Sequence, residues 1–222
     1  LGISKACGSV IELKKAASFD DVRCLNEKAM RLRDRYPDFF IPGFQIHPHY
    51  PEESLAEVER LVLGEGARWA GELVGYITGY GEEYATDAAL AVMRRLAELC
   101  VPVNIHFGAD ARVIEKLCAA VPELKVVAAH LPSAKKELAE KLDIMRRFAN
   151  LYYDLSGSAS VSRYGIVRRC TGELGAKRFL YGSDYPINSP GAILGAIRYE
   201  QLEPQDQADI LAGNFKRLIS GF

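Results

Sequence analysis

The chain has 222 residues, 49% of them hydrophobic and 26% charged, and its formal net charge at pH 7 is −1. This length and composition predict one soluble globular domain, residues 1–222, with a sizeable core. The near-zero charge argues against a nucleic-acid partner, and no apolar run is long enough to span a membrane. The five cysteines are scattered and form no CxxC pair, which predicts reduced, mostly buried thiols in a cytoplasmic protein.

Apolar periodicity and turn residues predict strands and helices in alternation. The expected strands cover residues 3–10, 39–46, 69–75, 101–106, 124–130, 151–157 and 178–184. The expected helices cover residues 19–35, 54–63, 87–99, 111–120, 134–148 and 204–219, with a further short helix before the last strand. Each strand–loop–helix–loop unit is about as long as one βα repeat.

The steady repeat identifies the fold class. Successive strand ends are separated by 25, 34, 24, 26 and 28 residues from His47 to Asp184, and neither a GxGxxG turn nor a Walker A motif occurs. An α/β fold of the (β/α)8 TIM-like barrel type is therefore favoured over a doubly wound sheet. Only seven strands are visible, so we expect the first strand of the barrel to be missing from this sequence. The natural protein should then carry a strand ending in His-x-His upstream of Leu1, within roughly 20–40 additional residues.

Polar groups that can bind metals follow three apolar strands. His106, His130 and Asp184 each stand at the carboxyl end of such a run. A single histidine there is more often a hydrogen-bonded core residue, but three matching strand ends meet on one face of a barrel. Imidazole and carboxylate ligands suit Zn²⁺, and they also accept Mn²⁺, Fe²⁺ or Ni²⁺. A bound cation would activate water, with a carboxylate taking its proton.

Other candidates have weaker support. Glu72 lies in the middle of an apolar strand, where an unpartnered carboxylate is costly, so we add it to the metal ligands. His47 is expected to line the substrate pocket, and metal binding through His47-Pro48-His49 is the less favoured alternative. Tyr185 is assigned to substrate binding, although packing of its loop would explain it equally well. Asp154 is expected to be a structural hydrogen-bonding residue.

Three of these stretches resemble a known family. Ile105-His106-Phe-Gly, Val-Ala-Ala-His130-Leu and Phe-Leu-Tyr-Gly-Ser-Asp184-Tyr-Pro resemble the fifth, sixth and eighth strands of the amidohydrolase superfamily, in its amidohydrolase-2 branch. The resemblance covers residues 37–219. In addition, the stretches around His47-Pro-His49 and Gly71-Glu72 are similar to the third and fourth strands of TatD-type deoxyribonuclease relatives.

The resemblance implies a distorted TIM barrel with a metal-dependent activity. His106 and His130 match the two metal-binding histidines, and His130 in mononuclear members acts on the substrate instead. Asp184 matches the aspartate that binds metal and moves the proton, and Glu72 matches a fourth-strand metal ligand. The first-strand His-x-His of the family is absent from this sequence.

Function follows as a prediction with two alternatives. We expect a metal-dependent hydrolase of a small C–N or C–O bonded substrate, with Zn²⁺ as the expected metal, metal-activated water as the nucleophile and Asp184 as the proton acceptor. A decarboxylase of the same fold is the first alternative, but such relatives carry long insertions after the strand-five histidine, whereas here a helix begins near Asp110. A metal-free binding or scaffold barrel is the second alternative. The expected partner is a small molecule, without nucleic acid or membrane, and assembly into a homo-oligomer stays open.

Overall fold

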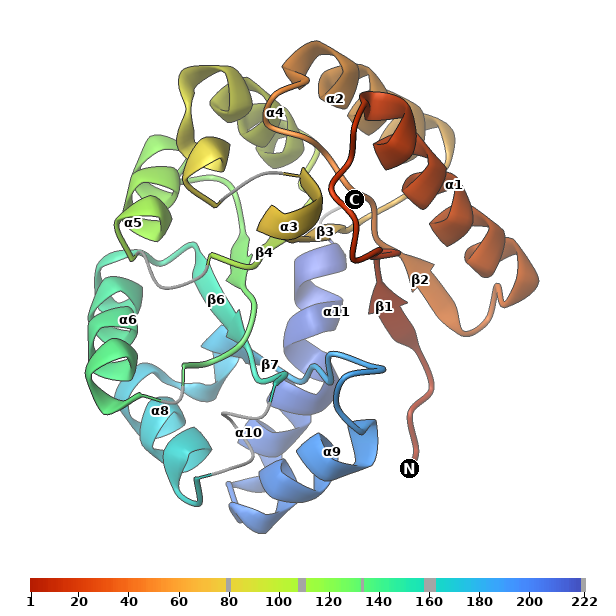
Figure 1. Cartoon of the computed structure of the whole chain (residues 1–222). Coiled ribbons are helices and arrows are strands. Elements are labelled where there is room, and N and C mark those ends of the chain that lie inside the picture. Colours follow the sequence, from red (N-terminus) through yellow and green to blue (C-terminus); the bar gives the residue numbers. More distant parts are fainter. Residues whose placement is uncertain (79–80, 108–110, 133, 158–162, 221–222) are drawn as a thin grey trace. The chain divides into compact units, whose positions relative to one another are not determined.

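The computed structural model describes residues 1–78, 81–107, 111–132, 134–157 and 163–220. Two compact units make up the chain, Leu1–Val126 and Val127–Gly221. Each unit repeats the order of a parallel strand followed by a helix (Figure 1).

The first unit contains two parallel strand pairs. β1 pairs with β2 so that Ala6 lies opposite Phe40, and β3 pairs with β4 so that Leu73 lies opposite Ile105. Its elements are β1 (Ala6–Gly8), α1 (Phe19–Arg35), β2 (Phe40–Pro42), α2 (Pro51–Val58), the π-helical turn η1 (Glu59–Gly64), β3 (Ala70–Leu73), α3 (Gly75–Thr78), the 3-10 turn η2 (Gly81–Ala85), α4 (Asp87–Glu98), β4 (Val103–Ile105) and α5 (Ala111–Ala120).

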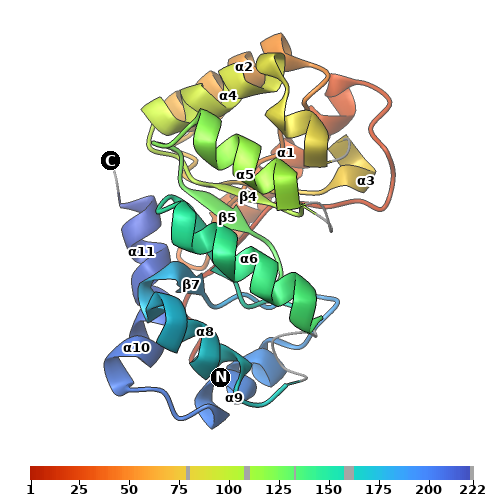
Figure 2. The ribbon, with the colours of Figure 1, turned by 90° about the vertical axis from the view of Figure 1, so that its left-hand side faces the viewer.

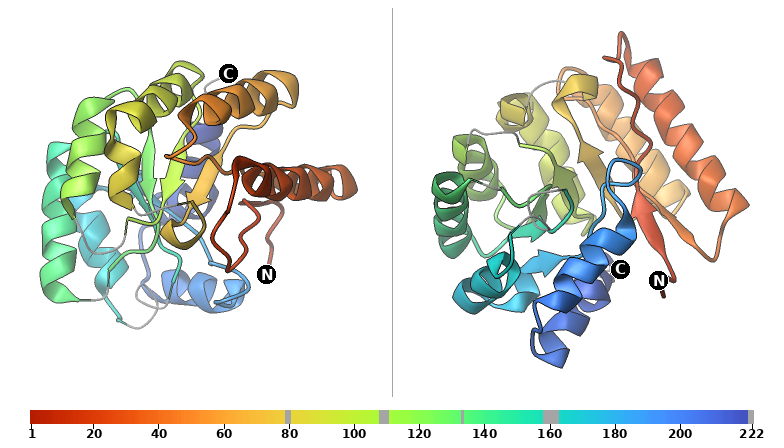
Figure 3. Two further views of the ribbon diagram at one scale, coloured as in Figure 1. Left: turned by 45° about the horizontal axis from the view of Figure 1, so that its top comes forward. Right: turned by 60° about the horizontal axis from the view of Figure 1, so that its bottom comes forward.

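Helix α1 packs beside β2 (Figure 3, right). Val22 and Ala29, on the apolar face of this helix, are fully buried. Between them Asn26 binds the chain just beyond β2, because its Oδ1 accepts from the Gln45 N–H at 2.7 Å and its Nδ2 donates to the Gln45 carbonyl at 3.1 Å. The helix thereby fixes the backbone of Gln45, two residues before His47.

Helix α2 begins earlier than predicted. It starts at Pro51, since proline suits the first helical position, and it continues as η1 to Gly64, so the predicted range 54–63 is too short at its start. α2 lies beside α4, as Figure 2 shows. The predicted boundaries of α1 and α5 are confirmed.

The second unit begins within β5 (Val126–Ala128). β6 and β7 are parallel, with Tyr153 opposite Phe179 and Asp154 opposite Leu180. The remaining elements are α6 (Lys135–Arg147), β6 (Leu151–Asp154), α8 (Ile166–Leu174), the 3-10 turn η3 (Ala176–Arg178), β7 (Phe179–Leu180), α9 (Pro190–Tyr199), α10 (Pro204–Ala208), the π-helical turn η4 (Asp209–Gly213) and α11 (Asn214–Ile219).

Strand β7 is short, and helices support both of its ends. Buried Asn214 of α11 donates to the carbonyls of Ala176 and Phe179 at 2.9 and 2.6 Å. The Tyr181 N–H, one residue past β7, donates to the Ile210 carbonyl in η4 at 2.8 Å. The residues that lead to Asp184 are therefore held by the last helical segment of the chain.

Arg178 supports the other side of β7. Its guanidinium donates to the carbonyls of Met145, Phe148 and Leu151, between the end of α6 and the start of β6. The arginine that opens the Asp184 stretch thus ties β7 to the preceding helix and strand.

Three expectations need correction. Helix α9 was not predicted, and the predicted helix 204–219 contains the π-helical turn η4 between α10 and α11. The expectation of mostly buried thiols is wrong, because Cys24 and Cys100 are exposed and only Cys118 and Cys170 are fully buried.

Among the described residues, no helix is both long and apolar enough to cross a membrane. The cytoplasmic location stays a prediction.

Candidate metal and catalytic site

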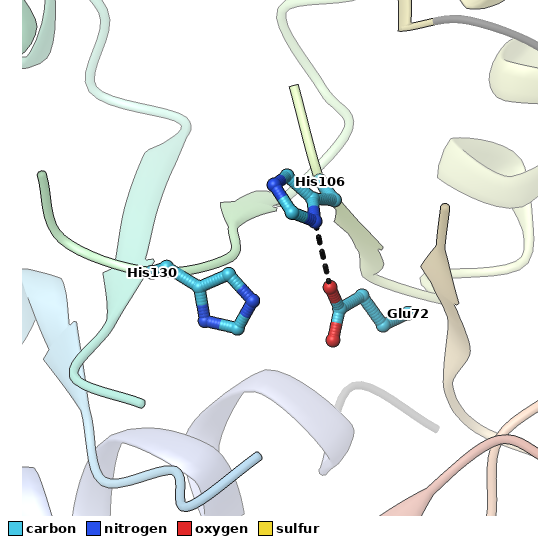
Figure 4. Close-up of side chains that lie close together, drawn as sticks. All are labelled: Glu72, His106 and His130. Atoms are coloured by element: carbon cyan, nitrogen blue, oxygen red, sulfur yellow. Dashed lines mark ion pairs between the residues drawn. The ribbon is translucent and has the colours of Figure 1, made fainter. Parts of the chain in front are cut away.

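The first unit brings Glu72 and His106 together. Glu72 lies in β3 and His106 follows β4, so both occupy the carboxyl ends of paired parallel strands. The His106 N–H continues the pairing by donating to the Leu73 carbonyl at 2.9 Å. Glu72 Oε1 is 3.6 Å from His106 Nδ1 (Figure 4, dashed line). The carboxylate side chain is 16% exposed and the imidazole 42%, so both are accessible to a ligand.

The backbone of Glu72 is held by two polar side chains. Gln45, which is fully buried, donates from Nε2 to the Glu72 carbonyl and to Ser9 Oγ, each at 2.7 Å. Ser9 Oγ also lies 3.4 Å from the same carbonyl. Neither Gln45 nor Ser9 was predicted to support the site. The only available indication was a glutamine inside an apolar strand, where an amide needs a partner.

The second unit brings His130 and Asp184 together. His130 follows β5 and Asp184 follows β7, and His130 Nε2 is 4.0 Å from Asp184 Oδ2. Both side chains are 23% exposed. Both residues also have left-handed backbones, with φ of +62° and +55°. A non-glycine residue in that region is strained, and such strain is concentrated at functional positions.

His130 is anchored by the end of β6. Its Nδ1 lies 2.8 Å from Ser156 Oγ, and its backbone N–H donates to Asp154 Oδ1 at 3.1 Å. The Ser156 hydroxyl and the Ser156 N–H also donate to Asp154 Oδ1. The prediction that Asp154 is a structural hydrogen-bonding residue is confirmed. The involvement of Ser156 was not predicted.

Asp184 is bound by the loop that follows it. The Asn188 N–H donates to the Asp184 carbonyl at 3.2 Å, and Asn188 Nδ2 donates to Asp184 Oδ2 at 3.4 Å. Tyr185 and Ile187 in this loop are 75% and 74% exposed. Tyr185 is thus accessible, and its assignment to substrate binding stays a prediction.

His47 is a buried residue of the turn into α2. Its backbone N–H donates to Ser54 Oγ at 2.9 Å, and its Nδ1 accepts from the His49 N–H at 3.1 Å. Burial lowers its pKa to about 4, with nearby His49 acting in the same direction and Glu83 opposing. The hydrogen bond at Nδ1 leaves that atom unsuited to a metal. A role for His47 in substrate binding stays a prediction.

The donor atoms in each pair suit a divalent metal. Two ligands of one tetrahedral ion, each about 2.1 Å from it, lie about 3.4 Å from each other. The separations of 3.6 Å in Glu72–His106 and 4.0 Å in His130–Asp184 are close to this value. Each pair combines one imidazole nitrogen with one carboxylate oxygen, which suits zinc or manganese.

Comparison with known proteins decides the family. The model of the amidohydrolase family matches residues 12–219. The chain belongs to the amidohydrolase family. No curated protein matches this chain.

Solved structures establish its fold. An uncharacterized TIM-barrel protein from Bordetella bronchiseptica is 18% identical with a TM-score of 0.75, covering 99% of this chain and 78% of that one. A 5-carboxyvanillate decarboxylase from Sphingomonas paucimobilis is 17% identical (TM-score 0.72; 90% and 72% covered). A dihydroxybenzoic acid decarboxylase from Polaromonas sp. JS666, with bound manganese and 2-nitroresorcinol, is also 17% identical (TM-score 0.71; 90% and 75%). The chain thus has the predicted α/β fold of the TIM-barrel class.

Proposed function

We propose that this protein is a metal-dependent decarboxylase of a carboxylated phenol. The observation that carries the proposal is the likeness over 90% of the chain to two decarboxylases, which act on 5-carboxyvanillate and on dihydroxybenzoic acid. This reverses the preference for a hydrolase drawn from the sequence. The proposal treats residues 1–222 as one catalytic barrel domain.

Hydrolysis of a small C–N or C–O bond is the second candidate. Helix α5 begins at Ala111, so no long insertion separates His106 from the next helix. That short connection was the reason for favouring a hydrolase, and it still supports one. The family model, which is described as amidohydrolase, is compatible with either reaction.

The residues proposed for the metal are Glu72 and His106 in the first unit and His130 and Asp184 in the second. Their nitrogen and oxygen donors support Mn²⁺ or Zn²⁺ equally. When bound, the metal would supply positive charge that orients the oxygen atoms of the substrate and stabilises negative charge on them.

Proton balance gives Asp184 a role in either reaction. Decarboxylation breaks the bond between the ring carbon and the carboxylate, releases CO2 and requires one proton at that carbon. A protonated Asp184 would donate that proton, which stays on the phenol, and Asp184 would then take up a new proton from solvent. His130 Nε2 lies 4.0 Å from Asp184 Oδ2. In hydrolysis the ionised Asp184 would instead take a proton from water. The two reactions therefore differ in the initial protonation state of the same carboxyl group.

The products distinguish the candidates. Protein depleted of metal by a chelator and reloaded with Mn²⁺ or Zn²⁺ would be incubated with 2,6-dihydroxybenzoate and 5-carboxyvanillate, and CO2 and the phenol would be measured. We expect equal amounts of both products, with metal required. Turnover of lactones, esters or amides without any CO2 release would overturn the proposal in favour of a hydrolase. Absence of both metal binding and turnover would favour the metal-free barrel.

A further inference from the structure

We infer that Ser156 and Asp154 hold the proton of the neutral His130 imidazole on Nδ1 and thereby make Nε2 the basic nitrogen. The inference starts from a chain of contacts within the second unit. Asp154 Oδ1 accepts from the Ser156 hydroxyl, and Ser156 Oγ lies 2.8 Å from His130 Nδ1. Ser156 is 4% exposed, so water competes little for its hydroxyl.

The count of hydrogens along this chain leaves one arrangement. An ionised carboxylate only accepts hydrogen bonds, and Asp154 Oδ1 already accepts from the N–H groups of His130 and Ser156 at 3.1 Å each. The single hydroxyl hydrogen of Ser156 must therefore point to Asp154. Ser156 Oγ is then an acceptor toward His130, so the hydrogen between them belongs to Nδ1. A neutral imidazole with a hydrogen on Nδ1 has its lone pair on Nε2.

The opposite tautomer would break this chain. With the hydrogen on Nε2, Nδ1 would need a donor, and the Ser156 hydroxyl would have to turn away from Asp154. The serine and carboxylate oxygens would then face each other in a buried site without a hydrogen between them, which is costly. Because the backbone N–H groups fix Asp154, the carboxylate cannot simply turn aside.

Two glycines leave room for the chain of contacts. A Cβ at Gly157, where φ is +88°, would lie 3.3 Å from His130 Nδ1. A Cβ at Gly182 would lie 3.0 Å from the Ser156 Cβ. The backbone is fixed as well, since the Leu155 N–H donates to the Leu180 carbonyl at 2.8 Å. The position of the Ser156 side chain is therefore restricted by its neighbours.

The consequence for turnover rests on the proposed function. A metal ligand or a proton acceptor needs a lone pair, and the inferred tautomer presents that lone pair on Nε2, the nitrogen 4.0 Å from Asp184. Ser156 and Asp154 are positioning residues, because they act through His130. Loss of such a partner typically reduces metal affinity or activity by about 10- to 100-fold.

The tautomer can be measured directly without metal or substrate. The protein has four histidines, so ¹⁵N NMR of its imidazole side chains gives few signals, and His130→Gln assigns one set. At about pH 8.5, where an ordinary histidine is neutral, we expect a hydrogen-bearing Nδ1 and a bare Nε2 for His130. A hydrogen-bearing Nε2 for His130 in the unmodified protein would overturn the inference.

Ser156→Ala tests the cause. We expect the His130 signals to move toward a mixture of both tautomers, and unchanged signals would overturn the inference. Ser54→Ala is the matched control, because Ser54 is also buried but its hydroxyl bonds only the backbone of His47. Failure of the decarboxylase assay would leave these NMR outcomes standing, so the two proposals fail separately.

Discussion

Each unit contains one proposed histidine–carboxylate pair, Glu72–His106 in the first and His130–Asp184 in the second, and the two pairs are held differently. Glu72 lies in β3, His106 directly follows the paired strand β4, and the carbonyl of Glu72 accepts a hydrogen bond from Gln45. His130 and Asp184 instead follow their strands in left-handed backbone conformations. The side chains of Ser156 and Asn188 are hydrogen-bonded to His130 and Asp184, respectively.

This difference indicates different functions for the pairs. The first pair is placed by the backbone pairing of β3 with β4, whose register shifts between Ala70 and Leu73, and such placement suits a fixed metal ligand. A pair in strained turns depends on its polar neighbours, and these neighbours can also set where protons reside. We therefore expect Glu72 and His106 to contribute mainly to binding and His130 and Asp184 mainly to proton transfer.

The largest expected effect would follow from Asp184→Asn. The change keeps the shape of the side chain and removes the group that carries the proton, so turnover should fall at least ~10²-fold. Folding should be retained, as measured by thermal unfolding. Asp143→Asn, on an exposed part of α6, is the control and should retain full activity. Wild-type turnover by the Asp184 variant would show that its carboxylate is structural.

Acid should destabilise the protein through His47. Its pKa in the folded state is lowered to about 4 by burial, whereas the unfolded chain takes up a proton near the ordinary value of 6.5. The stability that neutral His47 contributes is therefore fully present above pH 6.5. It is lost as the pH falls toward 4, by on the order of 3 kcal/mol. Urea unfolding between pH 7 and 4.5 measures this loss. His47→Asn keeps an acceptor for the His49 N–H, and an equally steep pH dependence in that variant would contradict the assignment.

Gln45→Met tests the support of the first pair. The change retains the volume but removes two donors from the Glu72 carbonyl and Ser9, so we expect a loss of about 1–2 kcal/mol in the free energy of unfolding. Metal titration should show weaker binding, while the His130 tautomer should not change. Gln205→Met on exposed α10 is the control. A shift in the His130 signals would show that a change near Glu72 alters the His130 tautomer, so that the two pairs are coupled.

A pair of glycine variants gives the smallest expected effect. Gly157 and Gly165 have nearly equal φ, +88° and +86°, so alanine at either position should cost about 1 kcal/mol. Only Gly157→Ala places a methyl group against His130, whereas Gly165 has open space around it. Turnover should therefore fall for Gly157→Ala alone. Equal turnover in the two variants would mean that His130 tolerates displacement.

The sequence was sufficient to predict elements with strong local patterns. The apolar spacing of Val22, Leu25 and Ala29 placed α1 correctly, and the strand ends at His106 and His130 were located from their apolar runs. Helix α9 was missed because Pro190-Gly191 and Gly195 make the segment resemble a loop. The π-helical turns were also missed, since one extra residue in a helical turn leaves little trace in local composition.

The supporting network could not be predicted in the same way. Gln45 binds Glu72 across 27 positions of the chain, and Ser156 binds His130 across 26. Such contacts depend on which strands become neighbours, whereas periodicity describes only one segment at a time. The positions of the candidates at or near strand ends could therefore be predicted, but the residues that are hydrogen-bonded to them could not.

The hydrogen bond from Tyr181 to Ile210 limits how this protein can be engineered. Beyond β7 the next backbone partner is supplied by a helix, so the last helical segment takes the place of a neighbouring strand. Asn214 adds two further bonds from the same segment. A deletion that removes this segment would detach the backbone three residues before Asp184, whereas fusions placed after Ile219 would preserve these bonds. Tags and truncations at this end should accordingly be designed around residues 209–219.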